Sequence, residues 1–216
     1  MRTALVTAGP TEEPIDAVRF VSNRSSGRMG IAIAEALAAQ GLAVTLALGP
    51  IRSEVPRSLR EHPRVRIARF GSSHDLQGLL ERELPGMDLV IMAAAVADYR
   101  PATVSEGKLR RTEGGLTLQL EGVPDLLACT RPFRKPGACV VGFALEPRER
   151  LERSALDKLA RKDLAAIVGN PLETMEAPDI EGTLFLRDGS VRSPGARVAK
   201  EAFASWLVSE LLPTGS

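Results

Sequence analysis

Short apolar segments alternate along the chain with longer segments whose apolar residues recur at helical spacing. Six apolar segments predict strands, at residues 4–9, 43–49, 65–70, 88–96, 138–146 and 164–170. Helical periodicity predicts helices at residues 27–41, 72–84, 124–131 and 148–163. Residues 88–96 are almost continuously apolar, as expected of a parallel strand that is buried on both faces. The pattern therefore predicts an α/β fold, with a doubly wound, mostly parallel sheet between two layers of helices.

The alternation is interrupted between residues 97 and 122, where the sequence is polar and loop-like. Within this segment the Gly114–Gly115 turn precedes residues 116–121, which alternate like an exposed strand. We expect a flap and a short ribbon that leave the sheet. A strand pair within residues 182–193 and an amphipathic helix at residues 196–212 are expected at the end of the chain.

Hydrophobic residues make up 44% of the chain and aromatic residues only 4%, so we expect a core of aliphatic side chains. Since no linker or repeat divides the 216 residues, we expect a single domain, residues 1–216. The formal net charge of +1 provides no overall field for nucleic acid. We expect no leader before the first strand, and no apolar run approaches the ~18 residues that span a bilayer. We expect a cytoplasmic protein with no nucleic-acid partner and no membrane partner.

The chain has two cysteines and two histidines, and neither pair suggests a reactive centre. Cys129 and Cys139 are not in a CxxC spacing, so we expect two reduced, unpaired thiols. His62 and His74 have no partner at metal-ligand spacing, and we expect both in solvent. A cysteine–histidine or serine–histidine–aspartate nucleophile therefore has no support.

The decapeptide VSNRSSGRMG, residues 21–30, places a polar, glycine-bearing turn directly before the first predicted helix. A helix N-terminus offers unpaired N–H groups and a partial positive charge, and glycines allow an anion to approach the backbone. The turn is suited to hold a phosphate or a carboxylate. The alternative is structural: Ser25 or Asn23 caps the helix, and Gly30 allows close packing of helix on strand. The turn lacks G-x-G-x-x-G spacing, which disfavours a tight dinucleotide-binding turn.

Several separated motifs, in the same order, resemble the phosphopantothenate–cysteine ligase family of coenzyme A biosynthesis, in its free-standing form. They are TAGPTEEPIDAVRFVSNRSSGRMG, AAAVADYRP followed by KLRR, VGFALE, and KLARKDLAAIVGN. The resemblance extends from about residue 3 to residue 170 and implies a Rossmann-like three-layer fold. It implies a ligase that joins 4′-phosphopantothenate and cysteine with CTP and Mg²⁺. The carboxylate first attacks the α-phosphate to form an acyl-CMP intermediate and pyrophosphate, and the amine of cysteine then displaces CMP.

The resemblance implies roles for the residues at matching positions. Catalytic roles fall to Asn23, whose amide would hold the acyl oxygen, and to Lys108, on a flap that closes over the site. The residues implied for the acyl substrate are Asn23, Ser25, Ser26, Gly27 and Asn170. Those implied for the nucleotide are Ala95, Val96, Asp98, Lys108, Pro124, Asp125, Leu126, Leu127, Phe143, Lys158 and Lys162. No residue is identified as a metal ligand.

The sequence departs from the family pattern at Val123, where asparagine is usual, and in the segment from residue 171 to 182. These departures leave open the choice between CTP and ATP, and a non-catalytic nucleotide-binding relative is one alternative. An NAD(P)-dependent oxidoreductase on a similar fold is another, although residues 43–49 end without the acidic residue that it needs. The family resemblance also implies a homodimer, and a phosphopantothenoylcysteine decarboxylase that is either a separate protein or a partner domain absent from this sequence.

Overall fold

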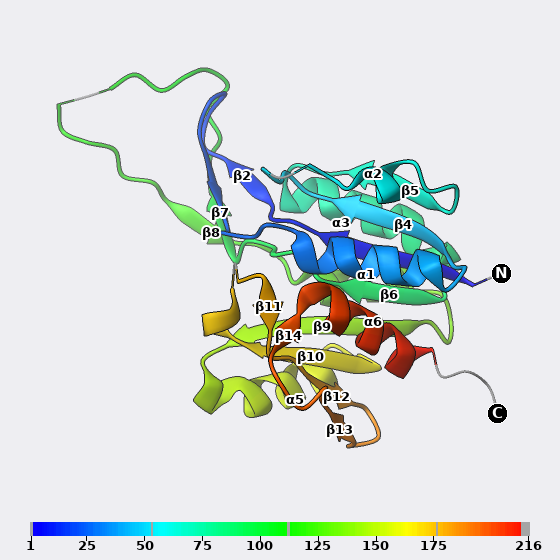
Figure 1. Ribbon diagram of the computed structural model, residues 1–216. Coiled ribbons are helices and arrows are strands. Elements are labelled where there is room, and N and C mark those ends of the chain that lie inside the picture. Colours follow the sequence, from blue (N-terminus) through cyan, green and yellow to red (C-terminus); the bar gives the residue numbers. More distant parts are fainter. Residues whose placement is uncertain (1, 53, 112, 176, 213–216) are drawn as a thin grey trace.

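The computed structural model describes residues 2–52, 54–111, 113–175 and 177–212. This part of the chain forms an eight-stranded sheet in the order β13-β12-β10-β9-β6-β1-β4-β5 (Figure 1). The strands are β1 (Thr3–Ala8), β4 (Ala43–Leu48), β5 (Val65–Arg69), β6 (Leu89–Met92), β9 (Cys139–Glu146), β10 (Ala166–Pro171), β12 (Thr183–Leu186) and β13 (Val191–Arg192). The six strands from β5 to β10 are parallel, and β12 and β13 add an antiparallel edge. The predicted doubly wound, mostly parallel sheet is confirmed.

Helices cover both faces of the sheet (Figure 1). One face is packed by α1 (Arg28–Ala39) and α6 (Lys200–Leu211), with α2 (Arg57–Arg60) at its margin. The other face is packed by α3 (Ser73–Glu83), α4 (Leu126–Cys129) and α5 (Leu151–Arg161). Strand β1 serves both layers, because Val6 points to the first face and Leu5 to the second, and both are fully buried. Short 3₁₀ turns occur at Leu84–Gly86, Arg131–Phe133, Arg148–Arg150 and Leu172–Thr174.

The strand expected at residues 88–96 is shorter than predicted, since β6 ends at Met92. Beyond β6 the chain makes one further parallel bridge, between Ala95 and Pro10. Two backbone N–H groups of this segment donate to side chains. Thr7 Oγ1 accepts a hydrogen bond from the Ala94 N–H, and Thr11 Oγ1 accepts one from the Ala97 N–H. The apolar pattern extends past the strand because this segment of small residues stays at least partly buried after the ladder ends.

The exposed strand expected at residues 116–121 is also wrong in its bounds. Only β8 (Leu120–Gly122) is a strand, and it pairs with β7 (Tyr99–Pro101). Leu116 and Leu118 are exposed, so no buried face stabilises a longer ribbon. The helix expected at 124–131 is the four-residue α4 followed by a 3₁₀ turn containing proline.

Two small strand pairs were not predicted. Strands β2 (Glu12–Pro14) and β3 (Phe20–Ser22) form a hairpin before α1, and β11 (Asp179–Ile180) pairs with β14 (Val198–Ala199) directly before α6. The β2–β3 hairpin, the β7–β8 pair and the long loop between β7 and β8 project together from the sheet (Figure 1). We call this unit the projecting arm. The expected flap lies in it.

Candidate active site

A cavity of about 830 Å³ opens at the carboxyl ends of the parallel strands. It lies at the point where the strand order changes direction. From β1 the chain continues through β4 and β5 on one side, and it then returns to add β6 on the other side of β1. In doubly wound sheets this crevice is where ligands bind. The cavity is lined by residues from separate segments of the chain: 22–30, 92–98, 123–127, 143–145, 158–162, 170–175, Ile180 and Lys200.

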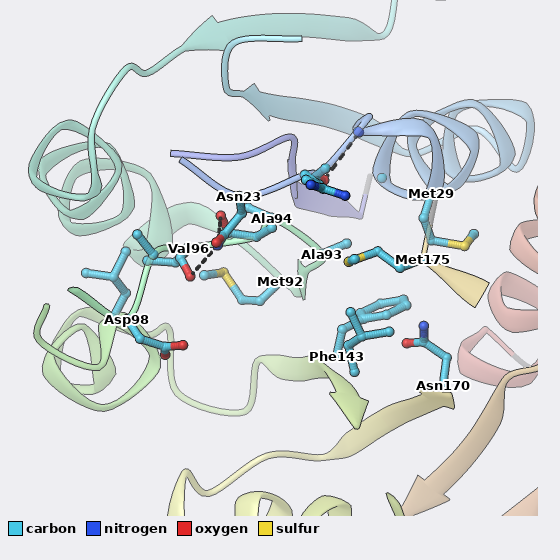
Figure 2. Close-up of a pocket in the computed structure, with 18 of the residues that line it drawn as sticks. Asn23, Met29, Met92, Ala93, Ala94, Val96, Asp98, Phe143, Asn170 and Met175 are labelled. Carbon is cyan, nitrogen blue, oxygen red and sulfur yellow. Dashed lines mark hydrogen bonds between the residues drawn. The ribbon is translucent and has the colours of Figure 1, made fainter. Parts of the chain in front are cut away.

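Asn23 joins two of these segments. Its Nδ2 donates hydrogen bonds to the backbone carbonyls of Ala95 and Val96, each at 3.1 Å (Figure 2). Both amide hydrogens are therefore used by the protein, and only Oδ1 is left for a ligand. The expectation that this amide donates to an acyl oxygen requires these two bonds to break. In the present arrangement Asn23 holds the turn against the edge of the sheet.

The start of α1 is open to the cavity. Gly27 is the N-cap residue, with φ of 73°, and no side chain caps the helix. Ser25 Oγ accepts only a long bond of 3.4 Å, from the Gly27 N–H. The capping interpretation of Asn23 and Ser25 is therefore wrong. The packing interpretation of Gly30 is confirmed, because a Cβ on Gly30 would lie 2.5 Å from the Cβ of Ala8.

Asp98 and Val123 meet through the backbone, where the Val123 N–H donates to the Asp98 carbonyl at 2.9 Å. This bond does not depend on the side chain at position 123. The Asp98 carboxylate is exposed at the cavity wall, and it forms no ion pair within the described residues. It is therefore free to meet a ligand.

Two lysines near the end of α5 line the opposite side of the cavity, and both are ion-paired. Lys158 Nζ lies 2.7 Å from Glu146 Oε1, and this bond holds the pKa of Glu146 below its usual value. Lys162 Nζ lies 2.9 Å from Asp125 Oδ2. Asp125 also caps α4, accepting from the N–H groups of Leu127 and Ala128. These α5 lysines are thus oriented before any ligand arrives.

Phe143 and Asn170 belong to neighbouring strands and lie in the cavity beside Met175 (Figure 2). Asn170 Nδ2 donates to Thr174 Oγ1 at 3.1 Å, and Thr174 in turn donates to the Pro171 carbonyl. Phe143 is partly buried and packs against the core on the α1 face. The altered segment after residue 170 is therefore folded onto the site and contributes to its wall.

Of the sequence-predicted site residues, all but one line this cavity: Asn23, Ser25, Ser26, Gly27, Ala95, Val96, Asp98, Pro124, Asp125, Leu126, Leu127, Phe143, Lys158, Lys162 and Asn170. The exception is Lys108, which is exposed on the projecting arm and outside the cavity. The arm must move, or a second chain must supply this lysine, for it to reach a bound ligand.

Residues 1–213 match the family model described as the DNA/pantothenate metabolism flavoprotein C-terminal domain. The chain belongs to this family. The chain is 40% identical over 173 residues to a cysteine/cysteine sulfinic acid decarboxylase from an unknown prokaryotic organism, covering 80% of this chain and 46% of that protein. It is 38% identical over 192 residues to the coenzyme A biosynthesis bifunctional protein CoaBC of Bacillus subtilis (strain 168), covering 87% of this chain and 46% of that protein.

The crystal structure of the C-terminal domain of a CoaBC protein superimposes with a TM-score of 0.79 at 31% identity. The match covers 97% of this chain and 93% of that domain. The chain spans about half the length of the curated relatives that it matches. Membership of the family confirms the resemblance found in the sequence.

Sequence reasoning missed several residues that line the cavity, among them three methionines and a lysine. Met29, Met92 and Met175 provide apolar wall, and Lys200 provides a buried cation (Figure 2 shows the three methionines). The methionines had no local signal, because each follows the ordinary pattern of its segment. Lys200 had a weak sequence signal, because it lies three and four residues before Phe203 and Ala204 and so shares the buried side of its helix.

Three further observations concern the cysteines, a possible metal site and membrane-spanning helices. Burial raises the pKa of both the Cys129 and the Cys139 thiols, and both cysteines are free. Within the described residues no three His, Cys, Asp or Glu side chains gather as a metal site. No helix in that part of the chain is long and apolar enough to cross a membrane.

Proposed function

We propose that this chain is a phosphopantothenate–cysteine ligase that acts in coenzyme A biosynthesis. The reaction joins 4′-phosphopantothenate and cysteine, consumes CTP, and releases pyrophosphate and CMP. The observation that carries the proposal is the convergence of fifteen family-matched residues from separate segments on one cavity at the switch point of the sheet. Membership of the family and similarity to CoaBC proteins support it.

In the first step a carboxylate oxygen of phosphopantothenate attacks the α-phosphorus of CTP. The bond to the β-phosphate breaks, so that acyl-CMP and pyrophosphate are formed. We propose that the nucleotide phosphates lie along α5, where Lys158 and Lys162 are presented by Glu146 and Asp125. A partial exchange of those carboxylates for phosphate oxygens would neutralise the triphosphate without reorganising the helix.

In the second step the amine of cysteine attacks the acyl carbon, and the bond to CMP breaks as the amide forms. The amine loses its proton to solvent or to the departing phosphate. We propose that Asn23 acts by holding the Ala95–Val96 edge at a fixed distance from the turn before α1. Lys108 would act last, by bringing a positive charge over the site when the arm closes.

Mg²⁺ is proposed as the metal that accompanies CTP, and the acidic residues of the cavity fit this role. Asp98 and Asp125 line the cavity, and Asp125 is already paired with Lys162. One available carboxylate suits a Mg²⁺ that is held mainly by phosphate oxygens and water, as is usual for this ion. Asp98 is therefore the residue that would hold it. When bound, the metal screens the triphosphate and orients the α-phosphate.

We also propose that the protein is a homodimer. Exposed large apolar side chains are concentrated on the projecting arm: Val18, Phe20, Tyr99, Val104, Leu116, Leu118 and Leu120. Exposed apolar residues of this kind mark interaction surfaces, and a second copy would cover the arm and help to place Lys108. A monomer by light scattering at micromolar concentration would contradict the dimer.

The deciding experiment is pyrophosphate release from the purified protein with Mg²⁺ and 4′-phosphopantothenate. CTP and ATP are supplied in turn, each with and without cysteine. Release with CTP, with cysteine-dependent formation of the amide, is the expected result, and the ATP arm gives the nucleotide preference. A folded protein that binds CTP but releases no pyrophosphate with either nucleotide would instead be a non-catalytic relative.

A further inference from the structure

Lys200, the first residue of α6, is a buried cation in the wall of the cavity. Only 7% of its surface is exposed, although lysine is among the residues least often buried. Its backbone is held in place, since its N–H donates to the Pro178 carbonyl at 3.2 Å. Within the described residues its ammonium group forms no hydrogen bond or ion pair. Burying an unpaired charge is costly, so this lysine calls for an explanation.

The nearest charges do not supply a partner. The Asp179 carboxylate is taken by Arg197, whose guanidinium lies 2.7 Å away. Burial lowers the pKa of Lys200, and the positive charge of Arg28 lowers it further. Asp179 and Glu201 oppose this shift but do not reverse it. An anion placed beside Lys200 would offset both unfavourable effects at once.

The open start of α1 lies in the same cavity wall. Helices α1 and α6 pack side by side (Figure 1), and both Lys200 and residues 27–30 line the cavity. Gly27 leaves the first turn without a side-chain cap, and that turn contains no acidic residue. The free N–H groups, Arg28 and the buried ammonium group therefore provide independent positive contributions at one end of the cavity. Together these groups would attract an anion to this end of the cavity.

Two cationic groups thus lie on opposite sides of the sheet, with Lys158 and Lys162 on α5 and Lys200 with Arg28 on α6 and α1. The proposed reaction has two phosphorylated reactants, and the nucleotide is assigned to α5. We propose that Lys200 and the start of α1 hold the phosphate monoester of the acid substrate and make the enzyme select phosphopantothenate over pantothenate. This inference rests on the proposed function.

The test compares phosphopantothenate with pantothenate in wild-type protein and in the Lys200→Met and Lys200→Arg variants. A charge-assisted hydrogen bond is worth about 1.5–3 kcal/mol, which corresponds to a factor of roughly 10–150. We expect Lys200→Met to raise KM for phosphopantothenate by roughly 10-fold or more, to leave KM for CTP within about two-fold, and to reduce the preference over pantothenate by the same factor. Lys200→Arg should recover part of the loss.

The control is Lys135→Met, which removes an exposed lysine paired with Asp88 at the amino ends of β6 and β9, away from the cavity, and should change neither KM. Replacing a buried, unpaired charge by methionine should also keep or raise Tm, whereas a purely structural lysine would lower it. An equal loss with both acids, or a raised KM for CTP alone, would overturn the proposal.

Calorimetric titration separates this proposal from the proposed function. If the wild-type protein turns over no substrate, phosphopantothenate and pantothenate are each titrated into wild type and Lys200→Met. Phosphate-dependent binding that weakens in Lys200→Met supports the anion site even though the ligase reaction fails. Wild-type protein that does not distinguish the two acids overturns the anion site, whatever the outcome for the ligase.

Discussion

The Asp16 carboxylate accepts a hydrogen bond from the backbone N–H of Leu109, 93 positions away, at 3.0 Å. The same carboxylate pairs with Arg19, whose guanidinium donates to the Leu109 carbonyl at 2.6 Å. Burial acts to raise the pKa of Asp16, but hydrogen bonds from Val18, Leu109 and Arg19 hold it well below the usual value. Both backbone groups of the residue after Lys108 are therefore held by the β2–β3 hairpin.

Replacing Asp16 by asparagine should loosen the flap without unfolding the protein. Asparagine removes the ion pair with Arg19 and leaves one oxygen acceptor where the carboxylate has two. We expect trypsin to cleave after Lys108 and its neighbouring arginines several-fold faster than in wild type. The control is Asp188→Asn, which removes an exposed turn carboxylate bonded to Ser190. Equal cleavage rates in the two variants would show that Asp16 does not restrain the flap.

Replacing Asn23 by aspartate should abolish most of the activity while the fold is kept. The isosteric carboxylate would face the Ala95 and Val96 carbonyls with an oxygen in place of a donor, at about the same separation. Two lost hydrogen bonds and the added repulsion correspond to roughly 3 kcal/mol, or about 100-fold in rate. The measurement is pyrophosphate release, with circular dichroism as the check on folding. Activity within a few-fold of wild type would contradict the role of this contact.

Two glycine-to-alanine changes should have opposite effects on stability. A Cβ on Gly30 would meet Ala8 and the Thr7 carbonyl within 3 Å, so Gly30→Ala should cost about 1–3 kcal/mol by overpacking. Gly78 is exposed on α3, and a Cβ there would meet no atom within 4 Å. Gly78→Ala should therefore stabilise by up to about 1 kcal/mol through helix propensity. Urea unfolding measures both, and equal effects would refute the close packing of α1 on β1.

Asp88 should make the stability depend on pH in acid. A hydrogen bond from Lys135, together with bonds from Thr3, lowers the pKa of Asp88 from 3.8 to about 2. When folding lowers the pKa of a carboxyl group, the ionised group stabilises the folded protein at every pH above its pKa in the unfolded chain. This stabilisation is lost as the pH falls towards its pKa in the folded protein. Between about pH 4 and about pH 2 the unfolding free energy of wild type should therefore fall more steeply than that of Asp88→Asn. Parallel curves for the two proteins would count against this contribution.

The sequence by itself determined the features that depend on local pattern. Short apolar segments marked the parallel strands, and the segment that forms β6 is continuously apolar, because a strand covered on both faces has no polar side. The helix predicted at residues 72–84 begins with two serines, which are favoured as caps, and Ser72 caps α3 in a capping box with Asp75. The family motifs also identified the proposed site residues that line the cavity, since each motif lies near the end of a strand and the carboxyl ends of parallel strands meet.

Only the tertiary structure decided the contacts between segments far apart in the chain. The two hydrogens of the Asn23 amide could not be assigned until Ala95 and Val96 were placed beside it. The strand partner of residues 120–122 could not be recognised from the sequence. Strands β7 and β8 have three residues each and β8 is exposed throughout, so no alternating buried face produces a pattern. Lys108 proved to lie outside the cavity and Lys200 within it, because burial of a charged side chain depends on which helices pack together, not on the residues next to it in sequence.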